Sequence, residues 1–182
     1  MPNRSPFPLA TDRLRLRLHQ PGDDAWLYEI YSQPAVARFL LEEPWTREEA
    51  TRQLEIRLAK TSLTPPTNAV ALVIECDSTP IGDISLWMTN PDLQVAEIGW
   101  VLDPRFGGQG FAREAVAAVL ATGFDHYRLH RVAAQMDARN TASAKLAGAV
   151  GMCQEAHLRQ DWWNKGEWTD TLIFGALATD DR

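Results

Sequence analysis

The chain has 182 residues, 45% of them hydrophobic, which is enough to bury the core of one compact domain. Its formal net charge of −6 makes nucleic acid a poor candidate partner, and a cationic molecule fits this acidic balance better. The start of the chain lacks the apolar segment of a signal peptide, and the longest nearly apolar run, 115–124, is too short to cross a bilayer. We therefore expect one cytoplasmic domain over 1–182, with a polar tail at 178–182 and no membrane partner.

Hydrophobic periodicity predicts an alternation of strands and helices along the chain. Leucine alternates with charge at 12–19, which predicts a half-buried strand. Helices are predicted at 22–40, where Pro34 interrupts the pattern, and at 46–60, which opens with a capping box. The remaining elements, in chain order, are strands at 68–76, 80–89 and 93–103, a helix at 110–127, a strand at 130–138, a helix at 140–151, and strands at 152–163 and 167–177. This order predicts a mixed sheet with helices on its faces.

Three glycines in four positions, Gly107, Gly108 and Gly110, lie between a predicted strand and a predicted helix. Glycine lets the backbone turn tightly and approach a ligand, and the first amides of a helix have no internal partner. The junction therefore predicts a phosphate site rather than a plain turn. Phe111 and Ala112 stand where a P-loop needs Lys and Ser or Thr, and the third glycine of a dinucleotide fingerprint is missing. Both nucleotide motifs are disfavoured.

Several motifs together resemble the GNAT acetyltransferases, and within them the branch that acetylates ribosomal-protein N-termini. These motifs are TDRLRLR near the start, EIGWVLDP and GGQGFAREA in the middle, and NTASAKLAGAVGM and GEWTDTLIFGAL towards the end. The family loop pattern, Gln/Arg-x-x-Gly-x-Gly/Ala, maps onto Gly107, Gly110 and Ala112, with Gly107 in place of the usual first residue. The resemblance covers nearly the whole chain. It implies a GNAT-like α/β (α+β) fold, with a mostly antiparallel central sheet of about seven strands flanked by about four helices.

The resemblance implies acetyl-CoA as co-substrate and no metal. The cofactor's pyrophosphate is expected on the glycine loop, and its pantetheine arm along 99–103, where the strand splays from the following one. Asn140 and Ser143 match a family Asn-x-x-Ser that faces the pantetheine and the sulfur. The expected cofactor contacts are Val101, Leu102, Phe106, Gly107, Gly108, Gln109, Gly110, Phe111, Ala112, Asn140 and Ser143.

Acetyl transfer from a thioester needs a base, because a free amine is mostly protonated at neutral pH. Glu97 is the candidate base, since strand alternation places it on the face opposite the apolar Ala96 and Ile98. Partial burial by a neighbouring tryptophan would raise its pKa. With a turn at 90–92, Ser85 is expected directly across from Glu97.

Two further groups complete the expected chemistry. The backbone amides of Val101 and Leu102 are candidate oxyanion donors. In many family members, a tyrosine at the position of Ala147 protonates the leaving thiolate. This chain has no tyrosine at that position. Ser143, one helical turn earlier, is the expected substitute, and water is the alternative.

Aromatic rings near carboxylates can hold a cationic amine. The expected acceptor-binding residues are Trp45, Ser85, Trp87, Asp161 and Trp162, where Asp161 falls near an acidic position of the branch.

Metal and disulfide chemistry are disfavoured. His126 and His130 have a metal-like spacing, but their helix is ending and the sequence shows no third ligand. Cys76 and Cys153 are too few for a disulfide framework and are interpreted as buried free thiols.

We therefore expect an acetyl-CoA-dependent N-acetyltransferase that acts by direct attack of the amine on the thioester. An α-amino group of a protein N-terminus or a small molecule stands ahead of polyamines and aminoglycosides as acceptor. A non-catalytic acyl-CoA-binding sensor is the alternative, supported by the missing tyrosine at Ala147. A nucleotide-binding module is weaker still. A homodimer is common for such domains, although no sequence pattern shows an interface.

Overall fold

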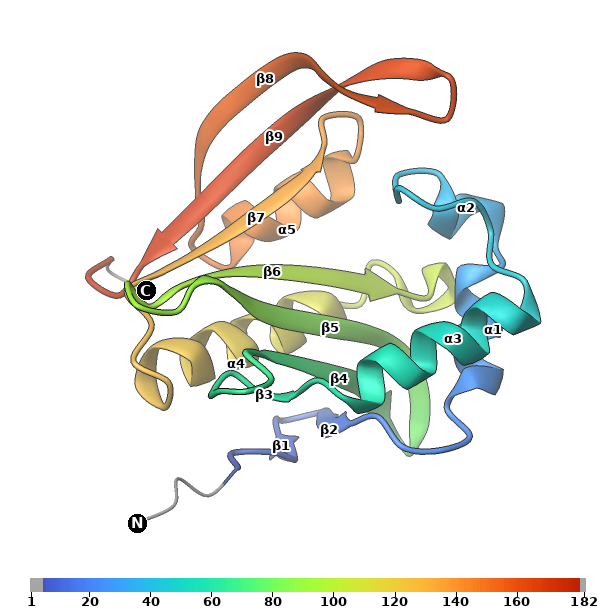
Figure 1. Ribbon diagram of the computed structural model, residues 1–182, viewed down its shortest axis with the longest axis horizontal. Helices are drawn as coiled ribbons and strands as arrows, with labels where there is room; N and C mark the ends of the chain where they lie inside the picture. The colour runs from blue at the N-terminus through green and yellow to red at the C-terminus, as the bar shows by residue number, and fades with distance from the viewer. Residues whose placement is uncertain (1–4, 181–182) are drawn as a thin grey trace.

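The computed structural model describes residues 5–180, whose strands form one sheet accompanied by five α-helices (Figure 1). The strands are β1 (Leu9–Ala10), β2 (Leu14–Leu18), β3 (Thr61–Ser62), β4 (Ala69–Cys76), β5 (Thr79–Asn90), β6 (Val95–Leu102), β7 (Arg131–Asp137), β8 (Cys153–Asn164) and β9 (Glu167–Leu177). The helices are α1 (Asp24–Tyr31), α2 (Pro34–Ala37), α3 (Arg47–Leu58), α4 (Phe111–Asp125) and α5 (Thr141–Ala149), with a 3-10 turn at Pro104–Phe106. Within this part of the chain, no helix is long and apolar enough to cross a membrane.

The sheet has the order β1-β2-β4-β5-β6-β7-β9-β8, with β3 beside β4. All neighbouring strands are antiparallel except β6 and β7, which run parallel. The predicted mixed, mostly antiparallel sheet is therefore confirmed. The structure adds the two-residue strands β1 and β3, which are too short to show alternation. Pro34 divides the first predicted helix into α1 and α2, because proline starts a helix more readily than it continues one.

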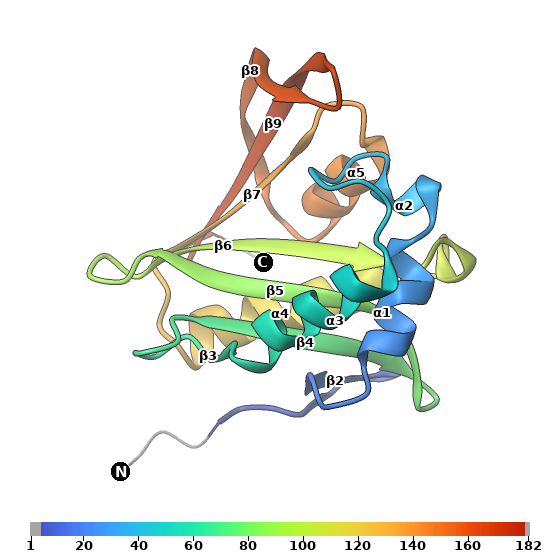
Figure 2. The same cartoon turned by 45° about the vertical axis from the view of Figure 1, so that its right-hand side comes forward.

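The parallel strands β6 and β7 pair over a short stretch and then separate. Their pairing runs from Val95–Glu97 to Arg131–Ala133 and stops there. Beyond it, β6 keeps β5 as its partner and β7 keeps β9, so the two strands diverge towards their C-terminal ends (Figures 1 and 2). The expected splay is present, and it opens the sheet in the middle.

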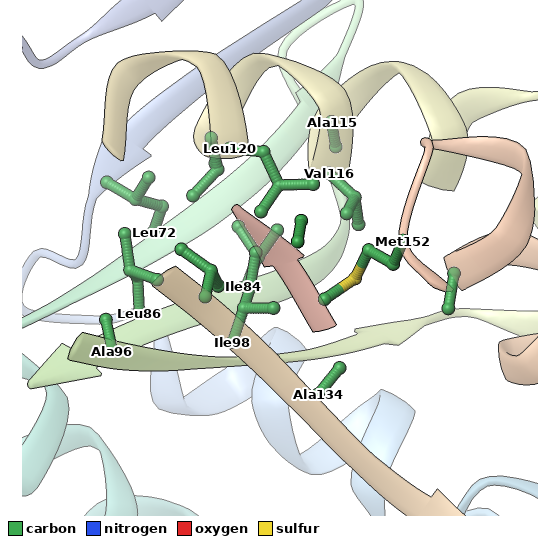
Figure 3. Close-up of a cluster of buried hydrophobic side chains, with 14 of the residues drawn as sticks. Leu72, Ile84, Leu86, Ala96, Ile98, Ala115, Val116, Leu120, Ala134 and Met152 are labelled. Carbon is green, nitrogen blue, oxygen red and sulfur yellow. The ribbon is translucent and has the colours of Figure 1, made fainter. Parts of the chain in front are cut away.

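The main core lies between the sheet and α4 (Figure 3). Apolar side chains at helical spacing on α4, including Ala115, Val116 and Leu120, face strand residues such as Ile84 and Ile98, and all five are buried. A second, smaller core lies between α1 and α3 and comprises Leu27, Ile30, Tyr31, Trp45, Ala50 and Leu54. Helices thus cover both faces of the central strands, which fixes the strand positions around the splay.

The predicted register between β5 and β6 is wrong. Trp87, rather than Ser85, lies directly across from Glu97, and Ser85 lies across from Gly99. The connecting turn is longer than predicted, with Asn90 opposite Val95, and an irregularity next to Met88 shifts the pairing. Since the shift is by two residues, Ser85 and Glu97 still share one face of the sheet.

Both cysteines are free thiols, as predicted, but neither is fully buried, and the prediction of burial is wrong for Cys153. Cys76 is half-buried, whereas Cys153 is exposed on β8, the edge strand of the sheet. In the predicted tail, Ala178 donates a hydrogen bond to the His130 carbonyl, and residues 181–182 lie outside the described part of the chain.

Candidate active site

The glycine loop delivers unpaired amides to the start of α4. Gly108 and Gly110 have φ values of 73° and 82°, in the left-handed region that glycine adopts without strain. The first hydrogen bond of the helix runs from the Glu114 amide to the Gly110 carbonyl at 3.0 Å. Among residues 5–180, the amides of 108–113 therefore have no backbone acceptor, and they lie at the positive end of a 15-residue helix. This is the arrangement of an anion site.

Arg13 holds the glycine loop in place through contacts with the loop and with the first turn of α4. Its guanidinium donates to the Gln109 carbonyl at 2.9 Å, forms a 2.7 Å ion pair with Glu114 and lies 4.5 Å from the centre of the Phe111 ring. These contacts tie the loop to the turn before β2. They also place Gln109 against Arg13 rather than among the residues that line the adjacent groove.

A groove of about 460 Å³, here called the loop groove, runs from the glycine loop to α5. Ten of the residues expected to contact a cofactor line it: Val101, Leu102, Phe106, Gly107, Gly108, Gly110, Phe111, Ala112, Asn140 and Ser143. Asn140 caps α5, since its side chain accepts a 3.1 Å hydrogen bond from the Ser143 amide. Arg113 also lines the groove, and it makes no ion pair with any described residue.

A second cavity of about 270 Å³, here called the inner cavity, lies on the other side of β6. Tyr31, Trp45, Arg57, Asp83 and Ser85 form its floor and walls. The opposite wall is the part of β7 that has separated from β6, residues 134–136. Six residues line both cavities: Phe39, Leu40, Trp100, Val101, Asn140 and Ser143. The two cavities therefore meet at the splay.

A buried network of polar groups forms the floor of the inner cavity. The Tyr31 hydroxyl and the Arg57 guanidinium both donate to the Asp83 carboxylate, the latter at 2.7 Å. Burial and the neighbouring carboxylate raise the pKa of Tyr31 well above its ordinary value, so this phenol stays protonated and keeps donating. His19 lies 3.9 Å from Asp83, but burial lowers the pKa of His19 to about 4 and leaves it neutral. Arg57 is thus the cation that compensates Asp83 near neutral pH.

The Arg57→Met substitution is expected to lower the free energy of unfolding by about 3–5 kcal/mol, because it leaves a buried carboxylate without its cation. Urea denaturation at pH 8, where His19 is neutral, measures the effect. The double variant Arg57→Met with Asp83→Asn removes both charges and is expected to recover part of the loss. A single variant within about 1 kcal/mol of the unchanged protein would show that the pair is not buried as described.

Glu97 lies beside the inner cavity rather than on its surface. Its carboxylate accepts a 3.2 Å hydrogen bond from Gln135, and Gln135 lines the cavity. Burial raises the pKa of Glu97, and the hydrogen bond from Gln135 offsets part of this rise. The sequence predicted the direction of this shift. Glu97 is therefore a better base than an exposed glutamate, but its connection to the inner cavity runs through its hydrogen bond with Gln135.

The residues expected to bind the acceptor fall into two groups, those that line the inner cavity and those that do not. Trp45 is buried and lines the inner cavity, with its ring stacked 3.9 Å from that of Tyr31. Ser85 lines the same cavity. Trp87 lies across from Glu97 outside the lining, while Asp161 and Trp162 are exposed on β8 and line neither cavity.

Sequence reasoning missed the network of Tyr31, Arg57 and Asp83, and also Arg113. Asp83 does stand out as a charge inside an apolar strand, which is a usable signal. Tyr31 and Arg57 give no local signal, since they lie 52 and 26 residues from their partner. Within the described residues, no group of three or more His, Cys, Asp or Glu side chains comes together that could hold a metal ion.

A sheet opened between two parallel strands, with a loop of unpaired amides on one side and an inner cavity on the other, is the arrangement expected of an acyl-CoA-dependent acyltransferase. The acetyltransferase (GNAT) domain family matches residues 13–153, and the chain belongs to that family of N-acetyltransferases. The N-acetyltransferase p20 of Bacillus licheniformis is 30% identical over 93% of this chain and 95% of its own length.

Solved structures of the same fold include two enzymes with stated substrates. The ribosomal L7/L12 alpha-N-protein acetyltransferase RimL, in complex with coenzyme A, has a TM-score of 0.83 at 20% identity, covering 93% of this chain and 97% of that one. The spermidine N-acetyltransferase of Vibrio cholerae, in complex with CoA and spermine, has a TM-score of 0.79 at 21% identity, covering 93% and 98%. At these sequence identities, the structural similarity shows that the fold is shared and nothing beyond it.

Proposed function

We propose that this protein moves the acetyl group of acetyl-CoA to a primary amine, and that the acceptor is the α-amino group of a protein N-terminus or a small molecule. The observation that carries the proposal is the shared lining of the two cavities at Trp100, Val101, Asn140 and Ser143. A thioester held in the loop groove and an amine held in the inner cavity would meet at these residues.

The loop groove suits acetyl-CoA. The cofactor's pyrophosphate matches the unpaired amides at residues 108–113, and the free guanidinium of Arg113 supplies a positive charge at the same place. The edge of β6 that faces β7 pairs with no described strand beyond Glu97, so its backbone groups are available to the amides of the pantetheine arm.

The proposed reaction has one covalent step. The amine nitrogen forms a bond to the thioester carbonyl carbon, and the bond between this carbon and sulfur breaks. The proton of the amine passes to Glu97 through a water molecule beside Gln135, because Glu97 does not itself line the cavity. The backbone amides of Val101 and Leu102 support the developing oxyanion, and the thiolate takes a proton from Ser143 or from water.

A polyamine is the second candidate acceptor. The inner cavity is lined by two carboxylates, Glu42 and Asp83, and by one cation, Arg57, which Asp83 already neutralises. The charge of Glu42 is left to attract a second ammonium group of the acceptor. The Vibrio cholerae enzyme named above holds spermine, which makes this candidate worth a direct comparison.

Release of free CoA thiol tests the proposal. The protein is mixed with acetyl-CoA and, separately, with a short peptide bearing a free N-terminus, an amino acid, spermidine or an aminoglycoside. We expect thiol release with at least one amine, together with a product heavier by one acetyl group. If acetyl-CoA binds but no amine releases thiol, the sensor alternative is correct.

A further inference from the structure

The tip of the β8–β9 hairpin is hydrogen-bonded to the segment that covers the junction of the two cavities. This segment, residues 34–42, comprises α2 and the chain after it and is here called the wall segment. The Asn164 side-chain amide donates to the Leu40 carbonyl at 3.2 Å, and the Lys165 ammonium donates to the Ala37 carbonyl at 2.5 Å. Both partners lie more than a hundred residues away in the sequence, and the hairpin tip is seen above the wall segment in Figure 2.

The wall segment needs such support. Its helix, α2, has four residues, and a helix of one turn is not stable by itself. After the helix, Leu40 packs against the smaller core, whereas Leu41 is 60% exposed, so packing holds this part of the chain on one side only. Nevertheless, Phe39 and Leu40 line both cavities. The shape of the junction therefore depends on contacts that hold this segment in place.

The backbone of Lys165 gives an independent indication that its side chain matters. Lys165 and Gly166 form the two-residue turn between Asn164 and Glu167, with φ values of 50° and 82°. Turns of this kind favour Asn, Asp or Gly at the first position, and a lysine there is strained. The side chain offsets this strain by donating to a carbonyl at the C-terminal end of α2, which a lysine ammonium does well.

We propose that Lys165, assisted by Asn164, is a positioning residue for acetyl transfer. It holds the wall segment closed over the junction, so that the thioester of acetyl-CoA and the acceptor amine meet in one arrangement. The positioning role rests on the proposed function, whereas the contact between Lys165 and the wall segment is independent of it.

The Lys165→Asn variant separates positioning from stability. Asparagine suits the left-handed turn, so Tm is expected to stay the same or rise. At the same time the ammonium donor is lost. We expect amide hydrogen exchange at residues 38–42 to be at least about fivefold faster in the ligand-free protein. We expect the Kd for acetyl-CoA to rise about tenfold. Lys165→Arg keeps a donor and is expected to restore both values.

The β4–β5 turn provides a matched control. Asp77 occupies the first position of a two-residue turn there, with φ of 47°, and it lines neither cavity. Asp77→Asn is expected to change neither the exchange at 38–42 nor the Kd.

Unchanged exchange at 38–42 in Lys165→Asn, or an Arg variant that behaves like the Asn variant, would overturn the positioning role. If the unchanged protein fails to bind acetyl-CoA, the proposed function falls. The exchange comparison in the ligand-free protein still decides whether Lys165 holds the wall segment.

Discussion

Ala112→Glu is expected to weaken acetyl-CoA binding at least about 100-fold, or about 2.8 kcal/mol, without unfolding the protein. Ala112 is the second residue of α4 and lines the loop groove. A carboxylate there would lie among the amides expected to hold the pyrophosphate and would repel its charge. The same carboxylate stabilises the helix, because it lies at the positive end of the helix dipole. Calorimetric titration with acetyl-CoA and a thermal melt measure the two effects.

The control is Ala117→Glu, which makes the same change on an exposed position of α4 away from both cavities. It is expected to bind acetyl-CoA like the unchanged protein. If Ala112→Glu keeps its affinity, the loop amides do not hold the pyrophosphate, and the glycines serve only the turn.

Glu97→Gln is expected to lower kcat by about 10²–10⁴-fold, the usual contribution of a general base, while the Kd for acetyl-CoA stays the same. Glutamine keeps the size of the side chain and a hydrogen-bond acceptor for Gln135 but cannot take a proton. The rate is measured with the best amine from the acceptor comparison. The exposed Glu55, on α3, provides a control as Glu55→Gln, which is expected to leave kcat unchanged.

The pH dependence gives a second test of Glu97. A base must be ionised, so activity is lost as pH falls through its pKa. Because burial raises the pKa of Glu97 above its ordinary 4.5, the acid limb of kcat is expected above pH 4.5 and is expected to vanish in Glu97→Gln. If the acid limb of kcat persists unchanged in Glu97→Gln, it reports the titration of a group other than Glu97.

The glycine loop could be predicted from the sequence because all its determinants are local. Gly107, Gly108 and Gly110 stand next to one another, the helix follows at once, and the groove they line is formed by that junction. Asn140 and Ser143 are expected at the site only through the family resemblance, and the structure shows that the two also form the cap of α5.

The inner cavity could not be predicted in the same way. Its floor joins Tyr31, Arg57 and Asp83 from three elements, α1, α3 and β5, and no spacing in the sequence shows that they meet. The position of Ser85 relative to Glu97 failed for a different reason, because one irregularity in a strand and a longer turn shift the register. Residue type alone predicts Trp162 at the acceptor site, whereas the structure places it exposed on the edge strand β8.

A crystal structure of the protein with acetyl-CoA tests the central claim most directly. We predict the pyrophosphate on the amides of residues 108–113 and the thioester at the junction of the two cavities, beside Val101 and Ser143. An ordered acetyl-CoA whose thioester lies away from this junction would contradict the account, because no amine in the inner cavity would then reach it.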